Sequence, residues 1–303
     1  MSISIVIPNY NGEEILAKNL PKVFEAVDNA EVIVVDDAST DGSLRTLNNF
    51  RSKISIIKNE RNLGFSSSVN KGVREAKGEI VILLNTDVVP EKNFLKPLLR
   101  HFEDGKIFAV GCMDKSIEDG KVILRGRGVG QWKRGFLVHS RGEINKASTL
   151  WVNGGSGAFR KSVWKKLGGF DELFNPFYWE DIDLSYRALK SGYKILFEPN
   201  SVVVHEHEKG AIKSTYSNFE VKTIAYRNQF IFVWKNLTDL DLCMLHLIWL
   251  PYHFAKAVTV WDLEFFKGFL MAFFLWPKII SSRFKSQKLF ARKDYEITNA
   301  SCE

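Results

Sequence analysis

Short apolar runs alternate with amphipathic stretches along the first 112 residues of the chain. The runs are rich in Val and Ile and have the length of buried strands, whereas the stretches between them carry apolar residues at helical spacing. We expect strands at 3–7, 32–35, 54–57, 80–84 and 108–110. Helices are expected at 13–27, 43–50, 66–76 and 92–102, with Ser43 and Ser66 as N-terminal capping residues. This alternation is typical of βαβ units and predicts an α/β fold with a Rossmann-like, doubly wound, mostly parallel sheet.

The hydrophobic pattern weakens between residues 113 and 147, where Gly, Lys, Arg and Asp are frequent. We expect this segment to be an excursion over the surface, mobile and near a site. A compact block follows from 150 to 207. It predicts a short helix from Ser162, a helix through Lys190 that Gly192 ends, and two short strands around Ile195 and Val203.

Aromatic residues crowd into helical segments after about residue 216. The longest stretch there without Asp, Glu, Lys or Arg runs from 242 to 255, which is shorter than the roughly 17 to 25 residues of a spanning helix. The pattern favours a helix lying in a membrane interface, with Lys256, Lys267 and Lys278 toward the head groups. The alternative is a helical cap on the α/β core or the face of a homodimer.

Composition agrees with a globular protein of one large domain with an appendage, or of two domains. A hydrophobic fraction of 45% in 303 residues is enough for a substantial core. The three cysteines are far apart and lack CxxC spacing, so neither a disulfide framework nor a zinc site is expected. We divide the chain into an α/β half at 1–112, a second half of the same domain at 113–215, and a basic helical region at 216–303.

Charge and the N-terminus bear on the location of the protein. The chain enters an apolar strand at once, without a basic region or cleavage site, so we expect it in the cytoplasm. The formal net charge is +7, and basic residues outnumber acids beyond residue 265. A basic tail suits an anionic lipid surface, which would place the protein at the inner face of the cytoplasmic membrane. It also suits nucleic acid, but the basic residues form no compact stripe interleaved with aromatics, so no nucleic-acid partner is expected.

Polar residues follow several predicted strands directly, where ligands of open parallel sheets bind. Pro8, Asn9 and Tyr10 follow the first strand, and Asp36 and Asp37 follow the second. An unpaired buried carboxylate is costly, so one of these two is expected to bind a nucleotide base or the backbone. The alternative for Asp36, or for Asp41 in the same turn, is that it caps the following helix.

The fourth strand ends in Asn85, Thr86 and Asp87. Asp87 is either an Asx-turn residue or a ligand of a hard cation such as Mg²⁺ or Mn²⁺. Neither a Walker-type phosphate loop nor a dinucleotide fingerprint is present in the sequence. A bound phosphate would therefore need a metal and basic side chains.

Three acids, Glu180, Asp181 and Asp183, open the predicted helix before Gly192. Helix-dipole effects and an i, i+4 pair of Asp183 with Arg187 explain part of this cluster. The aromatic run at 177–179 before it would form a wall on which a sugar can stack. A carboxylate partly desolvated by such a wall is a candidate general base.

Two histidines, His205 and His207, flank Glu206 at the end of a β-branched run. Alternate residues of a strand share a face, so both could point toward one site. They are candidate metal ligands beside the carboxylates, and the alternative is that they are hydrogen-bonded core residues.

Four stretches carry a resemblance to a known family: IVIPNYNG, VIVVDDASTDGS, NERNLGFSSSVNKGVREAKGEIVILLNTDVVP, and NGGSGAFRKSVWKKLGGFDELFNPFYWEDIDLSYRALKSGYKI followed by His205. In this order they resemble the family 2 glycosyltransferases, in particular the bacterial rhamnosyltransferase-like branch. The resemblance implies a GT-A fold, an inverting mechanism and a divalent metal cofactor, Mn²⁺ or Mg²⁺.

The resemblance also implies roles for individual residues. Asp181 corresponds to the catalytic base, and Asp87 and His205 correspond to metal ligands. Asn85 stands where many relatives have the first Asp of the DxD motif, which weakens the charge at the metal site. The remaining expected donor contacts are Pro8, Asn9, Tyr10, Asp37, Gly64, Asn70 and Arg187. The expected acceptor contacts are Gly154, Gly155, Trp179 and Glu180.

The sequence thus predicts an inverting glycosyltransferase that uses a UDP- or dTDP-sugar donor. Its acceptor is expected to be a lipid-linked or other cell-envelope saccharide. Two rival hypotheses are a sugar-1-phosphate nucleotidyltransferase and a non-catalytic nucleotide-binding module at the membrane surface. The turn after the first strand lacks the glycine-rich, basic loop typical of the former, and the retained Asp87, Asp181 and His205 argue against the latter.

Overall fold

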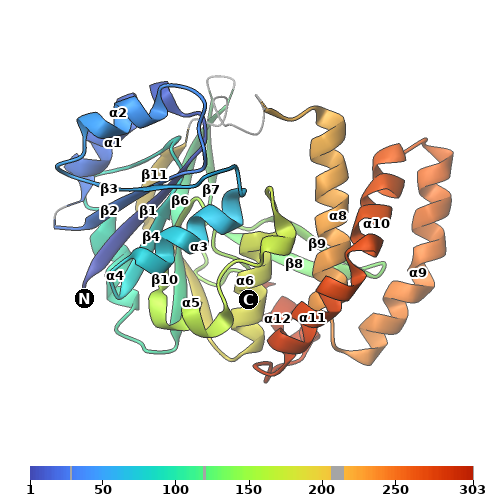
Figure 1. Ribbon diagram of the computed structural model, residues 1–303. Coiled ribbons are helices and arrows are strands. Elements are labelled where there is room, and N and C mark those ends of the chain that lie inside the picture. Colours follow the sequence, from blue (N-terminus) through green and yellow to red (C-terminus); the bar gives the residue numbers. More distant parts are fainter. Residues whose placement is uncertain (28, 119–120, 206–214, 303) are drawn as a thin grey trace.

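The computed structural model describes residues 1–27, 29–118, 121–205 and 215–302. A large mixed β-sheet with helices on both faces forms its centre, and C-terminal helices pack beside it (Figure 1). The strands are β1 (Ile3–Asn9), β2 (Glu31–Asp36), β3 (Ser55–Lys58), β4 (Ile80–Leu84), β5 (Val88–Pro90), β6 (Ile107–Glu118), β7 (Lys121–Arg125), β8 (Gly128–Lys133), β9 (Phe136–Arg141), β10 (Ser156–Arg160) and β11 (Lys194–His205). The helices are α1 (Glu13–Ala26), α2 (Ser43–Asn49), α3 (Phe65–Glu75), α4 (Leu95–His101), α5 (Lys161–Leu167), η1 (Glu172–Phe174), α6 (Glu180–Lys190), α8 (Asn218–Asn236), α9 (Leu240–Thr259), α10 (Leu263–Phe274), α11 (Trp276–Gln287) and α12 (Asp294–Cys302).

The central sheet has the strand order β3-β2-β1-β4-β10-β6-β11-β5, and β7 pairs with β6. Strands β1 to β4 are parallel, as are β6 and β11. Strand β10 is antiparallel to both of its neighbours, and β5 is antiparallel to β11. The predicted mostly parallel sheet is confirmed. The strand order reverses between β1 and β4, and such a switch point leaves a crevice at the carboxyl ends of the strands.

Side chains at alternate positions of the central strands pack into two apolar layers, one on each face of the sheet. Ile5 and Ile7 of β1 contact the layer that holds α1, α2 and α4. Val6 lies in the other layer, together with apolar residues of α3, α5, α6 and α8. Because successive side chains of a strand point to opposite faces, continuous runs such as Ile80–Leu84 are buried on both sides.

The expected elements of the first 112 residues form close to their predicted bounds, but two caps differ. Gly42 and Gly64 occupy the N-cap positions of α2 and α3, and neither helix has a side-chain cap bond. Ser43 and Ser66 are instead buried helical residues. The Ser43 hydroxyl accepts a hydrogen bond from the Gly12 backbone, at 3.1 Å, and so ties α1 to α2.

The expected surface excursion at 113–147 is wrong for much of that segment. Strand β6 continues to Glu118, β7 pairs with it, and β8 and β9 form a separate hairpin. Phe136 and Leu137 of this hairpin are buried in the core because α8 packs against β9. The apolar residues fall in two runs of three, 122–124 and 136–138, without the alternation of a half-buried strand, which hides the strand pattern.

The two short strands expected around Ile195 and Val203 are one strand, β11. Its pairing with β6 shifts register between Glu198 and Val202. This irregularity interrupts the strand pattern, so the sequence predicts two strands. His205 ends β11, whereas Glu206 and His207 lie outside the described residues.

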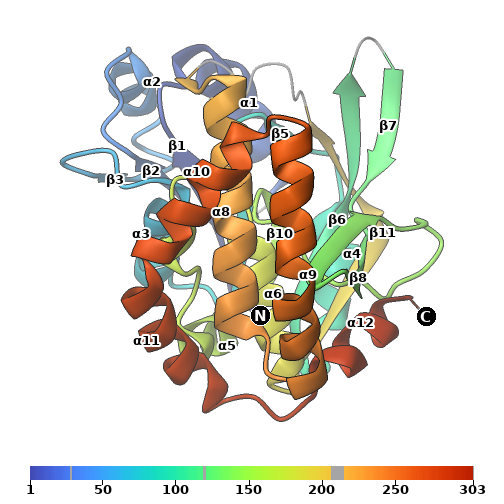
Figure 2. The same cartoon turned by 90° about the vertical axis from the view of Figure 1, so that its right-hand side faces the viewer.

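The C-terminal helices form two layers. Helix α8 is buried against the α/β core through Phe230, Ile231 and Phe232, as expected for a helical cap. Helices α9, α10 and α11 lie outside it and form the side that faces the viewer in Figure 2. Among the described residues, no helix combines the length and hydropathy needed to cross a bilayer.

Candidate active site

A cavity of about 950 Å³ opens at the carboxyl ends of β1, β2 and β4, and α6 and α8 contribute to its wall. It gathers residues that are far apart in the sequence. Most of the expected site residues line it, namely Pro8, Asn9, Tyr10, Asp37, Gly64, Asn85, Asp87, Gly154, Gly155, Trp179, Glu180, Asp181 and His205.

Asp37 lies on one side of the cavity, where it orders the loop before α3. Its carboxylate accepts hydrogen bonds from the backbone N–H groups of Leu63 and Gly64, each at 2.8 Å. Asn59 donates to the same carboxylate through its side chain at 2.7 Å. These donors offset the cost of burying the charge and hold the loop against the end of β2.

The neighbouring acids Asp36 and Asp41 have structural partners. Asp36 accepts hydrogen bonds from the Asn9 side chain and the Ser39 backbone, at 2.9 and 3.1 Å. Asp41 accepts from the backbone N–H of Ser43 at 2.9 Å and of Glu13 at 3.0 Å. Asp41 is therefore not the N-cap residue of α2, which is Gly42, but its carboxylate binds the first backbone N–H groups of both α1 and α2.

Asp87 lies in the turn between β4 and β5, and its side chain faces that of His205 at the end of β11. The His205 Nε2 atom is 3.3 Å from Asp87 Oδ2, and its Nδ1 atom is 2.9 Å from Asp114 Oδ2. Burial lowers the pKa of His205, but the hydrogen bonds to Asp114 and Asp87 outweigh burial and raise this pKa to about 9.

The donor set at this turn fits a divalent cation that keeps most of its coordination positions for substrate oxygens and water. No group of three or more His, Cys, Asp or Glu side chains suited to a metal occurs in the described part of the chain. Asp87 and His205 are therefore a two-residue set, and Asp114 orients the imidazole from behind. Beside them, the buried Oδ1 atom of Asn85 lacks a hydrogen-bond partner among the described residues.

Gly155 allows Asn85 to sit close to the backbone of the neighbouring strand segment. The Asn85 N–H donates to the Gly155 carbonyl at 2.9 Å. A Cβ atom on Gly155 would lie 2.4 Å from the Asn85 amide nitrogen, so any other residue would displace that side chain.

Glu180 and Asp181 begin α6 at the cavity wall, where Glu180 is buried and Asp181 is half-buried. Burial raises the pKa of Asp181, although hydrogen bonds from the Ile182 and Gly154 backbones, at 2.8 and 3.3 Å, oppose the shift. Burial and the Asp181 charge raise the pKa of Glu180 well above its usual range. The protonated form is therefore favoured more strongly at Glu180, and the Asp181 carboxylate gains basicity.

The loop before α6 has a strained backbone that α8 holds in place. Tyr178 and Trp179 have φ angles of 71° and 75°, which non-glycine residues rarely adopt. The buried side-chain amide of Asn228 donates to the carbonyl oxygens of Phe177 and Tyr178, each at 2.8 Å, and to that of Phe174 at 3.0 Å. The aromatic wall and the acids of α6 thus depend on a helix about 50 residues later in the chain.

A model of the glycosyl transferase family 2 matches residues 4–168, more than half of the chain. The chain belongs to this family. Its curated relatives include a pre-mycofactocin glycosyltransferase of Mycobacterium tuberculosis, 26% identical over 68% of this chain and 43% of the relative. The O-antigen chain rhamnosyltransferase WbaN of Salmonella anatum is 26% identical over 68% of this chain and 66% of WbaN. The chain thus spans less than half of the length of the first relative and just under two thirds of the second.

Solved structures show that this family 2 chain has the GT-A fold. GalNAc-T7 bound to UDP, GalNAc and Mn²⁺ superposes with a TM-score of 0.64 at 21% identity, over 78% of this chain and 48% of GalNAc-T7. The S. aureus protein TarS with UDP-GlcNAc has a TM-score of 0.61 at 18% identity, over 99% of this chain and 91% of the TarS fragment. The mannosyltransferase PcManGT of Pyrobaculum calidifontis, bound to GDP-Man and Mn²⁺, has a TM-score of 0.56 at 16% identity, over 94% and 86% of the chains.

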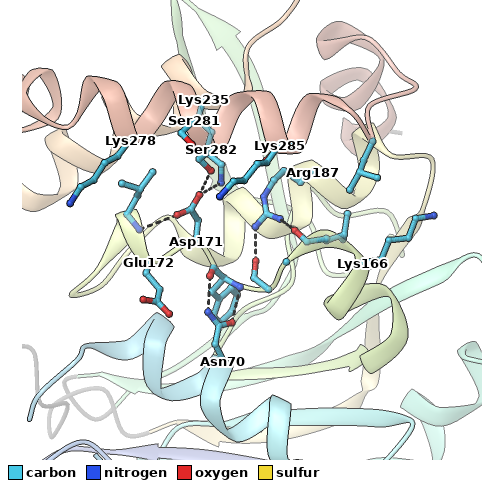
Figure 3. A pocket seen from close by; sticks show the side chains of 17 residues that line it. Asn70, Lys166, Asp171, Glu172, Arg187, Lys235, Lys278, Ser281, Ser282 and Lys285 are labelled. Carbon is cyan, nitrogen blue, oxygen red and sulfur yellow. Dashed lines mark hydrogen bonds and ion pairs between the residues drawn. The ribbon is translucent and has the colours of Figure 1, made fainter. Parts of the chain in front are cut away.

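Two expected donor contacts of this glycosyltransferase family member, Asn70 and Arg187, are not at the large cavity. Both line a second cavity of about 590 Å³ between α5, η1 and α11 (Figure 3). The Asn70 side chain exchanges hydrogen bonds with the Phe170 backbone, at 2.8 and 3.0 Å. Arg187 donates to Asp183 and to the carbonyls of Leu167 and Gly169. Their polar atoms therefore connect core segments, and we do not carry the two residues into the proposed donor site.

The i, i+4 pair expected between Asp183 and Arg187 is confirmed at 2.7 Å. Lys235 of α8 contacts Asp183 at 2.8 Å and Asp171 at 2.7 Å. Burial raises the pKa of Asp171, but the charge of Lys235 and hydrogen bonds outweigh it and hold this pKa well below its usual range. Lys235 thus joins α8 to α6 through a buried ionic network.

Sequence reasoning missed several residues of the cavity, among them His139, Trp151 and Tyr216. His139 of β9 contacts Trp151 and Trp179 edge to face, with ring centroids 5.3 and 5.1 Å away. Burial lowers the pKa of His139, which favours a neutral imidazole. The segment of His139 carries no strand pattern, so only the hairpin and its packing against α8 bring this histidine to the site.

Proposed function

We propose that this chain transfers a sugar from a UDP- or dTDP-sugar to an acceptor hydroxyl with inversion at the anomeric carbon. The observation that carries the proposal is one shared cavity. Asp181, whose basicity is raised by burial, lines the same cavity as the Asp87 and His205 pair. A general base and a diphosphate-binding site on one cavity are what a direct displacement requires.

Asp181 is the proposed general base. Its carboxylate takes the proton of the acceptor hydroxyl as the acceptor oxygen attacks the anomeric carbon from the face opposite the diphosphate. One bond forms to the acceptor oxygen and one breaks to the phosphate oxygen, so the configuration inverts. The Gly154 N–H, 3.3 Å from Asp181 Oδ2, orients the carboxylate for this role.

Asp87 and His205 are the proposed ligands of a divalent ion, Mn²⁺ or Mg²⁺. Such an ion supplies positive charge to the leaving diphosphate. Asp114 fixes the ring of His205 from the other side at 2.9 Å, so Nε2 points toward Asp87. The complexes of GalNAc-T7 and PcManGT each contain Mn²⁺ with a nucleotide or nucleotide sugar, which supports the same choice here.

The donor's nucleotide is placed between the ends of β1 and β2 and the loop before α3. Pro8, Tyr10 and Asp37 line this part of the cavity. The hydrogen bond between Asp37 and Gly64 fixes the loop on which the nucleotide base is proposed to lie. On the opposite wall, Gly154, Trp179 and Glu180 are proposed to face the acceptor. A lipid-linked or other cell-envelope saccharide is the proposed acceptor class, in keeping with the name of WbaN.

Calorimetric titration tests the donor site first. The full chain is titrated with UDP, dTDP and GDP, each with Mn²⁺, with Mg²⁺ and with excess chelator. We expect one nucleotide to bind only in the presence of metal. Absence of binding in every condition would contradict the proposal and favour a non-catalytic module. Release of pyrophosphate from a nucleoside triphosphate and a sugar 1-phosphate would instead identify a nucleotidyltransferase.

A further inference from the structure

The outer side of the C-terminal helices exposes many large apolar side chains. We call this side the outer helical face, and its exposed apolar residues are Leu240, Met244, Leu245, Leu247, Ile248, Tyr252, Val258, Val260, Trp261, Leu263, Leu270, Phe273, Phe274, Trp276 and Phe284. Trp261, Leu240 and Phe274 are 84%, 82% and 79% exposed. Figure 2 shows α9, α10 and α11, which carry these residues, on one side of the molecule, with part of α8 visible between α9 and α11. So many exposed large apolar side chains on neighbouring helices indicate an interaction site.

The same helices bury a second set of aromatic residues, so the exposed set is not needed for their packing. Phe265 and Phe269 of α10 contact Phe230 of α8, with ring centroids 5.5 and 5.3 Å away. A Cβ atom on Gly268 would lie 2.7 Å from the Tyr226 Cβ, which shows how closely α10 approaches α8. The inner faces of these helices therefore complete the core, and the outer face is left for another partner.

Charge indicates the chemistry of that partner. The exposed charged residues between 240 and 288 are one acid, Asp241, and five lysines. Lys278 and Lys285 line the second cavity, so Lys256, Lys267 and Lys288 remain to border the outer helical face. Several lysines are four residues from an exposed apolar residue, as in Tyr252 with Lys256 and Leu263 with Lys267. Residues at this spacing are neighbours on a helix surface. The face therefore presents apolar side chains bordered by positive charge.

We propose that the outer helical face docks on the surface of an anionic lipid bilayer, with α9 and α10 in the plane of the interface. Apolar and aromatic side chains would enter the boundary of head groups and acyl chains, and the lysines would contact lipid phosphates. A second copy of the chain fits this surface less well. A two-fold interface would place the same lysine-rich surface against itself, and like charges repel.

Docking would also place the cavity close to the bilayer. Ala225 of α8 lines the cavity, while residues 223, 226 and 227 of the same helix contact Gly268 of α10. Helix α8 and the outer layer that contains α10 thus lie between the cavity and the outer helical face. This arrangement suits a lipid-linked acceptor, a conclusion that rests on the proposed function, whereas docking itself does not depend on it.

Vesicle sedimentation tests docking without any catalytic readout. The full chain is mixed with vesicles of phosphatidylcholine and phosphatidylglycerol, or of phosphatidylcholine alone, at low and high salt. We expect sedimentation with the anionic vesicles that weakens at high salt. The double variant Ile248→Glu with Phe274→Glu should reduce the bound fraction at least about tenfold, since both side chains are exposed and their loss removes only lipid contacts.

Val122→Glu is the matched control, because Val122 is 64% exposed but belongs to β7, away from the outer helical face. Its vesicle binding should equal that of the wild type. Equal binding of the double variant and the wild type would overturn the proposal. A dimer in sedimentation equilibrium that the double variant dissociates would also overturn it, in favour of a second copy. Donor binding measured on the same variants separates failure of docking from failure of the proposed function.

Discussion

The side-chain amide of Asn228 donates a 2.8 Å hydrogen bond to the carbonyl oxygen of Tyr178, 50 residues earlier in the chain. This bond holds a residue with a positive φ angle directly before the acids of α6. The C-terminal helices therefore do more than cover the core. They fix the backbone from which the proposed base projects.

Replacing Asn228 by Ala should therefore impair turnover. The carbonyls of Phe177 and Tyr178 would lose this donor, and that of Phe174 would keep only a 3.5 Å contact from Arg227, at a cost of roughly 1–3 kcal/mol in the free energy of unfolding. The loop would relax away from its strained geometry, so kcat should fall more than donor affinity does. Asn218→Ala is the control, because Asn218 is an exposed residue at the start of the same helix. Thermal melts and steady-state rates measure the two effects, and a variant with normal kcat would show that the loop needs no such support.

Asp181→Asn and Glu180→Gln should behave oppositely in a transfer assay. An Asn side chain cannot take the proton from the acceptor hydroxyl. The transfer rate of Asp181→Asn should therefore fall by about 10²- to 10⁴-fold, while calorimetry still detects donor binding. Gln has the shape of protonated Glu180, whose pKa is raised well above the usual range by burial and by Asp181, so most activity should remain. The reverse order of effects would assign the base to Glu180.

The wild-type transfer rate should depend on pH through Asp181. A general base works only when deprotonated, and burial raises the pKa of this carboxyl. The rate should therefore fall as the pH decreases, and the fall should begin above the pH range of an ordinary aspartate. Profiles of kcat measured in overlapping buffers test this, and a rate that stays constant down to the usual aspartate pKa would argue against Asp181.

Glu180→Gln should stabilise the protein at alkaline pH. A carboxyl whose pKa is raised by folding contributes stability below its unfolded pKa, and this contribution is lost as the pH rises through the folded pKa. Gln has no proton to lose, so the free energy of unfolding should be higher than that of the wild type at about pH 8 and little changed at about pH 4. Glu25→Gln, at an exposed site on α1, should show no such difference. Urea unfolding at both pH values gives the comparison.

Asp114→Asn should weaken metal-dependent nucleotide binding without removing a proposed ligand. Asp114 contacts Nδ1 of His205 at 2.9 Å, and loss of such an orienting carboxylate typically lowers metal affinity about 10- to 100-fold. Asp104→Asn is the control, because Asp104 forms an ion pair with Lys194 far from the cavity. Titration of Mn²⁺ in the presence of nucleotide measures the affinity, and an unchanged value would argue that His205 does not bind the ion.

Local patterns were enough to predict the first half of the fold. Strands β1, β2 and β4 are buried on both faces, so their β-branched runs stand out, and Asp37 and Asp87 follow them directly. The same holds for the acids that open α6. Each of these signals comes from a few neighbouring residues, so it can be recognised in the sequence without knowledge of any distant contact.

Other features could not be read this way. The hairpin of β8 and β9 has no clear alternation because Phe136 and Leu137 are buried next to each other while β9 ends exposed. Arg187 and Asn70 belong to the expected motifs, yet the direction of each side chain is set by the neighbouring carbonyls it binds. A motif gives the position of a residue in the chain and not the surface toward which it points.

The sequence alone determined the family resemblance, the α/β sheet and the carboxylates at the ends of its strands. Only the tertiary structure decided that His139 and Tyr216 reach the cavity, that Asn228 holds the loop before α6, and that one side of α9 and α10 stays uncovered. The physical reason is that strand and helix patterns arise from neighbouring residues. The environment of a polar side chain, or the exposure of an apolar one, depends on which distant segment packs against it.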